Sequence, residues 1–292
     1  MPMTFRRCLS LPLSLLLLGM DLELRESQAV ERAEAAAATP DAKSPADGGP
    51  TGAAGDELVQ FSLLAALAAG DYGGGAPLGE VLKFGNFGVG TFDRLDGEMI
   101  VLDGEIFQVV ASGEVVLRDD QGATPFATVT FFEADGTIDG ISAGSLTELD
   151  QTLDRRVPKD KRPFALKVTA EFEELTLRSA PPQKPPYRPL AEVIDQQRVW
   201  KREHVRGTLI GIRCPEWMGT LNVAGYHWHF LSDDRKIGGH VLDCRFSDGR
   251  VAYDECSSVL VRLPTSASFG AIDMSGVSEA DVDKIERQRG GK

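Results

Sequence analysis

The sequence is poor in cysteine and lacks an excess of positive charge. Only three of its four cysteines, Cys214, Cys244 and Cys256, lie beyond the N-terminal region, and no Cys-x-x-Cys pair occurs among the 292 residues. An odd number without that spacing argues against a disulfide framework. The formal net charge of −13 argues against nucleic acid or an anionic membrane surface as a partner.

No hydrophobic run is long enough to span a bilayer comfortably. The longest, in "MPMTFRRCLSLPLSLLLLGM", follows Arg6 and Arg7 and stops at Asp21, as in a secretory signal. Cys8 precedes the run, which excludes a lipoprotein signal, and Ala-x-Ala appears only near residues 35–38. We expect residues 1–32 to direct export to the periplasm or the medium. If this segment is not a signal, we expect a cytoplasmic protein, and in neither case membrane insertion of the folded domain.

Large apolar side chains are nearly absent from residues 33–56, "AEAAAATPDAKSPADGGPTGAAGD". Such a segment cannot bury enough surface to offset its ordering entropy, so it is predicted to be a disordered linker. The folded domain is therefore expected to cover residues 57–292.

Short β-rich runs dominate that domain. Asp96-Gly97 and Asp103-Gly104 interrupt a succession of predicted strands from Gly90 to Leu117, and Asp-Gly is a strong hairpin turn signal. Further strands are predicted at 126–133 and at 164–179, the second with a break near Glu173. We expect a strand-rich α+β fold with mixed and antiparallel sheets.

Helix signals are few. Apolar spacing predicts short helices at 56–75, 145–157 and 278–288, with Ser278 as the N-cap of the last. The glycines of "GNFGVGTF" precede no helix, so they are a weak nucleotide-loop signal. No internal repeat is evident.

A proline-rich stretch, "SAPPQKPPYRPLAEVIDQQ" (179–197), divides the predicted domain. It cannot form a regular element before Leu190. We interpret it as a long connector between two closely associated halves, about 57–200 and 201–292.

Histidine is also scarce, yet three of the four histidines lie in "GYHWHFLSDDRKIGGH" (225–240). His227 and His229 would share one face of a strand, and the Ser, Asp and Gly that follow predict a hairpin with His240 on the return strand. The three imidazoles could then converge on a metal ion; the alternative is a wet polar face. Cys244 would share a strand face with His240 but would lie about 13 Å along the strand from it, too far to ligate the same ion without a bend.

Four stretches taken together resemble acetolactate decarboxylase, over about Glu57 to Arg289. They are "LGEVLKFGNFGVGTFDRLDGEMIVLDG" (78–104), "TPFATVTFF" (124–132), "LRSAPPQKPPYRPLAEV" (177–193) and "LNVAGYHWHFLSDDRKIGGHVLD" (221–243). The resemblance implies decarboxylation of (S)-2-acetolactate to (R)-acetoin with a bound zinc ion, in acetoin and butanediol formation. It also implies a homodimer.

The resemblance further assigns residues to the site. It implies that His227, His229 and His240 are the zinc ligands. It also implies three catalytic residues, Glu98, Arg178 and Glu286, and substrate binding by Thr91 and Arg178. Three neutral imidazoles leave coordination positions open, as a catalytic zinc requires, and a guanidinium suits a substrate that carries a carboxylate.

Each of these residues also has an ordinary structural explanation. Glu98 after a turn could be a solvated strand residue, Arg178 could pair with Glu171 or Glu173, and Glu286 could lie on the surface, as we expect for His204. The same motif would also suit another zinc lyase or hydrolase that acts on a small 2-hydroxy-3-keto acid, or a non-catalytic zinc-binding module.

Overall fold

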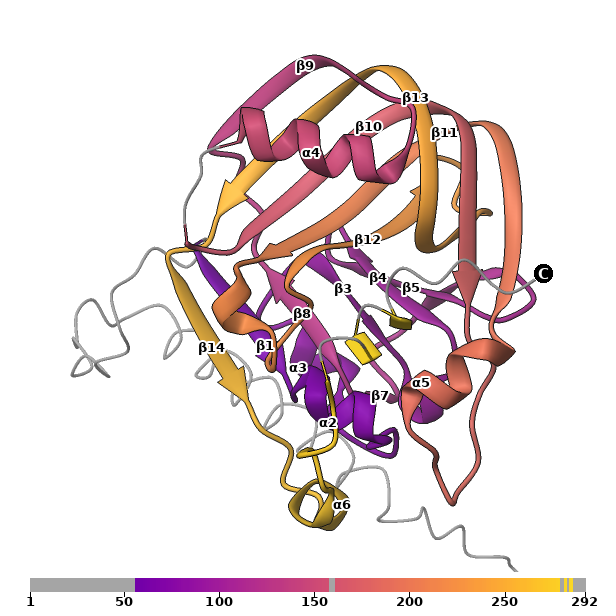
Figure 1. Cartoon of the computed structure of the whole chain (residues 1–292), viewed down its shortest axis with the longest axis vertical. Coiled ribbons are helices and arrows are strands. Elements are labelled where there is room, and N and C mark those ends of the chain that lie inside the picture. Colours follow the sequence, from indigo (N-terminus) through magenta and orange to yellow (C-terminus); the bar gives the residue numbers. More distant parts are fainter. Residues whose placement is uncertain (1–55, 158–160, 279–280, 283, 286–292) are drawn as a thin grey trace, which may run out of the picture. The chain divides into compact units, whose positions relative to one another are not determined.

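The computed structural model describes residues 56–157, 161–278, 281–282 and 284–285. All of them belong to one unit of the chain, Thr51–Lys292. Two large sheets form this unit (Figure 1), which confirms the predicted strand-rich α+β class with mixed and antiparallel sheets. Within the described residues, no helix has the length and apolar character needed to cross a membrane.

The first sheet has seven strands in the order β14-β1-β8-β3-β4-β5-β6. All neighbours are antiparallel except β1 and β14, which are parallel. Between β4 and β5, Asp103 and Gly104 both have positive φ (53° and 82°), the two-residue turn that Asp-Gly predicts. The strands are β1 (Glu57–Phe61), β3 (Phe87–Thr91), β4 (Glu98–Leu102), β5 (Glu105–Val109), β6 (Val115–Arg118), β8 (Ala127–Thr130) and β14 (Ser258–Arg262).

The second sheet has five longer strands in the order β10-β11-β12-β13-β9. Because β13 also pairs with β10, the four strands β10 to β13 form a closed circuit of pairings. Strand β10 continues through Glu173, so the predicted break there is wrong; its register against β13 instead shifts between Phe172 and Glu174, as at a β-bulge. The strands are β9 (Gly136–Ala143), β10 (Phe164–Ser179), β11 (Arg198–Cys214), β12 (Gly225–Ser232) and β13 (Gly238–Glu255).

Helix α4 (Leu146–Arg156) confirms the prediction for 145–157. The Oγ of Ser145 accepts a hydrogen bond from the backbone N–H of Glu148 (3.2 Å), which caps the helix, and the Glu148 carboxylate accepts one from Gly144 N–H (2.8 Å) just before the cap. The remaining elements are short: α2 (Leu64–Ala69), β2 (Ala76–Pro77), α3 (Leu78–Val81), η1 (Asp93–Leu95), β7 (Ala123–Thr124), α5 (Leu190–Val193), η2 (Ile194–Gln196), η3 (Glu216–Met218) and α6 (Ala267–Ala271).

Two layers of the core lie on the two faces of the five-stranded sheet. One layer holds Leu166, Phe172 and Phe230 together with Leu149 and Leu153 of α4. The other joins the two sheets and includes Leu58, Phe87, Val89, Ile100, Ala165, Ile210, Ile212 and Leu231. Neighbouring residues such as Ala165 and Leu166 enter different layers, as the alternation of a strand requires.

Two predictions about local structure need correction. Residues 57–61 form strand β1 rather than the start of a helix, because they pair with β8 and β14 and bury Leu58, Val59 and Phe61 inside a sheet. Helix α2 begins only at Leu64. Fully buried strands and helices are hard to distinguish from a short apolar run.

The connector at 179–197 joins β10 to β11, which are antiparallel neighbours in one sheet. The predicted boundary after residue 200 therefore falls inside β11 rather than between the sheets. The predicted signal (1–32) lies outside the described residues, and of the predicted linker (33–56) only Asp56 is described.

Candidate functional site

The hairpin formed by β12 and β13 brings three histidines together. His229 pairs directly with His240, and His227 lies on the same face of β12. The ring centroids are 4.9 to 5.4 Å apart, and one nitrogen from each ring lies within 4.8 Å of the other two. All three side chains are buried. The predicted hairpin and the predicted convergence of the imidazoles are both confirmed.

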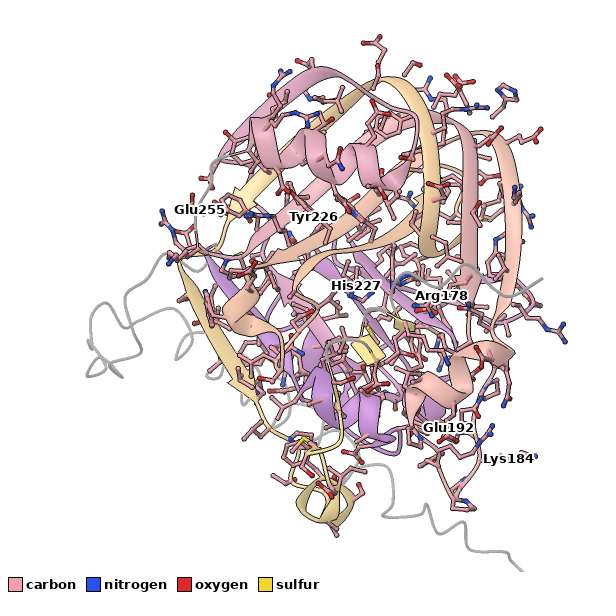
Figure 2. All side chains as sticks on the ribbon, viewed as in Figure 1. Arg178, Lys184, Glu192, Tyr226, His227 and Glu255 are labelled. Atoms are coloured by element: carbon pink, nitrogen blue, oxygen red, sulfur yellow. The ribbon has the colours of Figure 1, made fainter. Side chains whose placement is uncertain are left out.

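Strand β12 divides its side chains between two environments. Tyr226, Trp228 and Phe230 pack in the core layer beneath α4, whereas His227 and His229 point to the opposite face, toward the seven-stranded sheet. Figure 2 shows His227 and Arg178 in this inner region. The histidines are therefore held on a strand whose other face is anchored by large aromatic rings.

His229 is oriented as a metal ligand would be. Its Nδ1 donates a hydrogen bond to the backbone carbonyl of Met99 (2.7 Å), which places the ring proton on Nδ1 and the lone pair on Nε2. Among the described residues, Nε2 makes no hydrogen bond. A buried imidazole with this tautomer and a free lone pair fits a metal such as zinc.

Two of the histidines, His227 and His229, are also held in the neutral form that ligation needs. Burial, with a contribution from the positive charge of Arg178, lowers the pKa of His227 to about 3. Burial first, and then His227, lowers the pKa of His229 well below its usual value. Protons therefore compete poorly with a metal for these two nitrogens.

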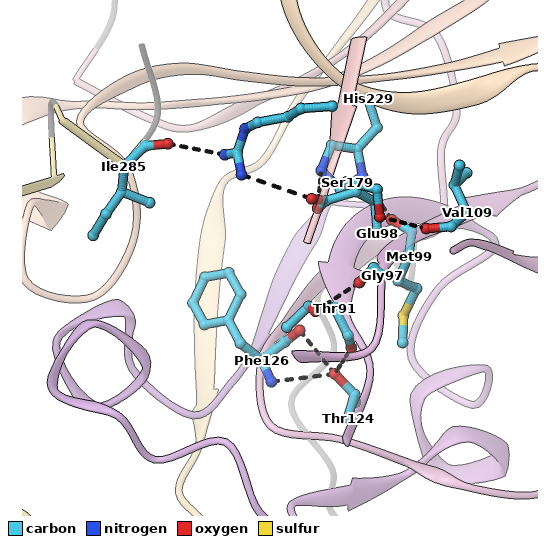
Figure 3. Close-up of polar contacts among 11 residues, drawn as sticks. Thr91, Gly97, Glu98, Met99, Val109, Thr124, Phe126, Ser179, His229 and Ile285 are labelled. Carbon is cyan, nitrogen blue, oxygen red and sulfur yellow. Dashed lines mark hydrogen bonds and ion pairs between the residues drawn. The ribbon is translucent and has the colours of Figure 1, made fainter. Parts of the chain in front are cut away.

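Glu98 begins β4, directly after the Asp96-Gly97 turn, and is only 7% exposed. Its Oε2 lies 3.5 Å from Nε2 of His229, and its Oε1 lies 3.7 Å from Nη1 of Arg178. The alternative of a solvated strand residue is therefore wrong. Thr91 Oγ1 donates to the carbonyl of Gly97 (2.7 Å), which holds the turn that presents Glu98 (Figure 3).

Arg178 is 4% exposed and comes from β10, where it pairs with His240. Its Nη2 donates to the carbonyl of Ile285 (2.9 Å), and its Nε makes no hydrogen bond among the described residues. Glu173, one of its suggested partners, pairs with Arg245 instead (3.2 Å). A buried guanidinium with an unused N–H is suited to an anionic ligand.

These side chains line one pocket between the two sheets. Its polar residues are Thr91, Glu98, Arg178, His227 and His240. Its apolar residues come mainly from α2, the η1 turn, the α5 region and the C-terminal segment: Leu64, Leu67, Leu95, Phe126, Leu190, Ile194 and Ile285. The pocket therefore combines charged and polar side chains with an apolar wall formed by these residues.

Most of the predicted site residues meet in this pocket. Glu286 lies outside the described residues, although its neighbour Ile285 lines the pocket. His204 is exposed, as expected.

Cys244 does not share a face with His240, which corrects that expectation. A register irregularity in β13 between Val241 and Asp243 turns both Val241 and Cys244 into the core layer under α4.

The apolar wall and the Met99 carbonyl were not predicted. Leu64, Leu95 and Ile194 are ordinary apolar residues in sequence, and a backbone carbonyl carries no sequence signal. The charged neighbours of Leu95 in sequence do not predict its place in the pocket either, because Leu95 lies in a turn and has a positive φ of 60°.

Comparisons with known proteins agree with this geometry. A family model described as alpha-acetolactate decarboxylase matches residues 58–276. Alpha-acetolactate decarboxylase from Methanosarcina mazei is 40% identical over 80% of this chain and 81% of its own length, and the protein of that name from Raoultella terrigena is 36% identical over 74% and 84%. The crystal structure of alpha-acetolactate decarboxylase from Bacillus subtilis strain 168 superposes with a TM-score of 0.77, at 29% identity over 80% of this chain and all of that one.

Proposed function

The chain belongs to the alpha-acetolactate decarboxylase family, whose members are carboxy-lyases, and on this premise we propose that it is a zinc enzyme that converts (S)-2-acetolactate to (R)-acetoin and carbon dioxide. We place this reaction in acetoin and butanediol formation. One observation carries the proposal: a buried group of three histidines lies beside a buried guanidinium and a buried carboxylate in a single pocket.

The metal in the proposal is zinc, held by His227, His229 and His240. All-nitrogen ligation by imidazole suits zinc, and three protein ligands leave positions open, as in catalytic rather than structural zinc sites. When bound, zinc supplies Lewis-acid stabilisation of the negative charge that develops on the substrate oxygens as carbon dioxide leaves.

Arg178 binds the substrate carboxylate in this proposal. Its guanidinium is buried, so the charge is weakly screened, and its Nε remains available for an anion. The hydrogen bond from Nη2 to Ile285 fixes the plane of the guanidinium. A carboxylate bound there would have its carbon–carbon bond oriented by a rigid partner.

Glu98 handles the proton. Its carboxylate lies between His229 and Arg178, within reach of a substrate hydroxyl bound next to the histidines. Glu98 would accept the hydroxyl proton and return a proton to one face of the enediolate, and a further proton taken from solvent restores the hydroxyl, which yields a single acetoin enantiomer. Thr91 contributes by holding the turn before Glu98, and Glu286, next to Ile285, is proposed as a second acid or base.

The apolar wall completes the pocket. Leu64, Phe126 and Ile194 exclude water from the reacting carbon atoms and leave space suited to the two methyl groups of acetolactate. A site of this kind limits unwanted protonation before the product leaves.

The test combines metal analysis with a product assay on the purified full-length protein. We expect about one zinc per chain, release of carbon dioxide from (S)-2-acetolactate, and (R)-acetoin on a chiral column. Zinc bound without carbon dioxide release would favour another zinc lyase, a hydrolase or a non-catalytic module. Full activity after removal of all metal by a chelator would refute the zinc assignment.

Two further proposals concern location and assembly. We propose export directed by residues 1–32, which fractionation of the native host would test by the position of the activity. We propose a homodimer, as the family resemblance predicts; light scattering on the purified protein should give about twice the mass of one chain.

A further inference from the structure

Helix α4 is bonded to both strands that carry the histidines. At its N-terminus, the backbone N–H of Leu146 donates to Oδ1 of Asp243 (2.9 Å), which lies on β13 three residues after His240. One turn later, Asp150 Oδ1 accepts a hydrogen bond from Nε1 of Trp228 (3.0 Å). The helix therefore connects β13 to β12 through side chains outside the pocket.

A third contact extends this connection. Asp154 Oδ1 accepts a hydrogen bond from the hydroxyl of Tyr226 (2.9 Å) and lies 3.6 Å from Nε of Arg213. Positions 146, 150 and 154 are four residues apart, so they lie along one side of the helix. That side follows β12 from Trp228 to Tyr226, the two residues that flank His227.

The strand ladder itself does not hold His227 relative to His240. In the described residues, β12 pairs with β13 only at His229, Phe230 and Leu231, whereas its first half pairs with β11 alone. His229 has the additional hydrogen bond to the Met99 carbonyl, whereas the segment around His227 pairs with β11 but not with β13. The contacts to α4 occur in this half of the strand.

Trp228 is placed to transmit the position of the helix to the strand. Its ring is 1% exposed and lies so close to Gly211 of β11 that a side chain there would collide with it. It also stacks on Tyr226, with ring centroids 5.8 Å apart and planes inclined by 3°. A shift of the indole would therefore move the backbone between His227 and His229.

We propose that α4 is a brace that sets the position of His227 relative to His240, and that Asp150 is a positioning residue for the metal ligands. This inference rests on the proposed function, because it takes the three histidines as ligands of zinc. Asp150 acts through Trp228 and does not touch the pocket. Asp150 thereby keeps the ligating nitrogens of the three histidines at a distance suited to metal binding in the metal-free protein.

The experiment measures zinc affinity by competition with a chelator in three full-length variants. Asp150→Ala removes the acceptor, Asp150→Asn keeps Oδ1, and Gln151→Ala changes the neighbouring exposed residue. We expect Asp150→Ala to bind zinc about tenfold more weakly, as for groups that orient ligands. Asp150→Asn should lie close to the parent protein and Gln151→Ala should match it. Zinc affinity within twofold of the parent for Asp150→Ala would overturn the proposal, even if its melting temperature falls.

A second readout does not depend on zinc. In metal-free protein, NMR signals of the His227 and His229 rings should move in Asp150→Ala and stay in place in Gln151→Ala; unchanged ring signals would count against the brace. If Asp150→Ala fails to fold, Trp228→Phe removes the donor together with one ring of the indole and is judged by the same criteria. Failure of the parent protein to bind zinc would refute the proposed function, and the ring signals would still decide on the brace.

Discussion

The two sheets contribute to the pocket in different ways. The five-stranded sheet supplies all three histidines from one hairpin, within fourteen residues of sequence, and adds Arg178 from the neighbouring strand. The seven-stranded sheet supplies Thr91, Glu98 and the Met99 carbonyl from short strands more than a hundred residues away. The three histidines therefore come together through local sequence, whereas the Glu98 carboxylate lies beside them only because the two sheets pack together.

This difference predicts that substitutions in the two regions have different effects, on metal binding in one case and on the reaction rate in the other. A substitution in the hairpin that removes one of the three histidines should release the metal, because it leaves only two of the proposed ligands. Damage to Glu98 or Arg178 should leave the metal in place and slow the reaction. The following variants test whether the division holds.

The largest effect is expected for His229→Ala. It removes the proposed ligand whose tautomer is set by the Met99 carbonyl. The protein should therefore lose bound zinc and at least about 1000-fold in activity, since metal and charge stabilisation disappear together. Elemental analysis and carbon dioxide release are the measurements. His204→Ala, at an exposed histidine, is the matched control and should keep both. A His229→Ala protein that retains stoichiometric zinc would contradict the ligand assignment.

Arg178→Lys is expected to keep zinc and lose kcat/KM. Lysine retains the charge but not the planar fork, so a charge-assisted contact worth roughly 2–4 kcal/mol in the transition state is lost, or about 30- to 1000-fold. Steady-state kinetics with metal analysis on the same sample checks this. Arg245→Lys, which alters an exposed pair with Glu173, is the control. A rate within twofold of the parent would exclude Arg178 from the active-site machinery.

Glu98→Gln should also retain zinc and slow the reaction by about 100-fold, near the lower end for general acid–base catalysis. Glutamine keeps the volume between His229 and Arg178 but cannot accept the proton. The decrease should appear in kcat. Loss of zinc in this variant would mean that Glu98 is itself a ligand, and the seven-stranded sheet would then share in metal binding.

The pH dependence of stability should follow the buried histidines. In the metal-free protein the pKa of His227 is about 3, below the ordinary 6.5, so the unfolded chain binds protons that the folded chain excludes. Stability is therefore full above about pH 6.5 and falls as the pH decreases toward 3, by up to about 1.4 kcal/mol per pH unit for each such histidine. Denaturant titrations of metal-free protein at several pH values measure this slope. His227→Gln should reduce the slope, and an unchanged slope would contradict the burial effect.

The smallest effect is expected for removal of residues 1–56. A protein that begins at Glu57 keeps all of β1 and every described pocket residue. Turnover should stay within twofold and the melting temperature within a few degrees, as kinetics and calorimetry would show. A large loss in either would indicate that the N-terminal region contributes to the folded domain.

Local patterns in the sequence were sufficient to predict the histidine hairpin, helix α4 and the Asp-Gly turn between β4 and β5. Each depends on interactions between residues close in sequence: the period of two that places His227 and His229 on one face, the Ser145 cap, and the positive φ of Gly104. The resemblance to a known family added Thr91, Glu98 and Arg178, which composition alone would have left as ordinary surface or paired residues.

Other features were decided by the tertiary structure. Strand β1 looked helical because a buried strand and a buried helix can share one apolar run, and only pairing with β8 and β14 distinguishes them. The apolar wall, the Met99 carbonyl and the bonds from α4 to Trp228 depend on contacts between segments 70 to 130 residues apart. The amino-acid sequence by itself therefore determined which side chains could bind a metal. The packing of two sheets and a helix decided how those side chains are oriented, because orientation depends on neighbours that are distant along the chain.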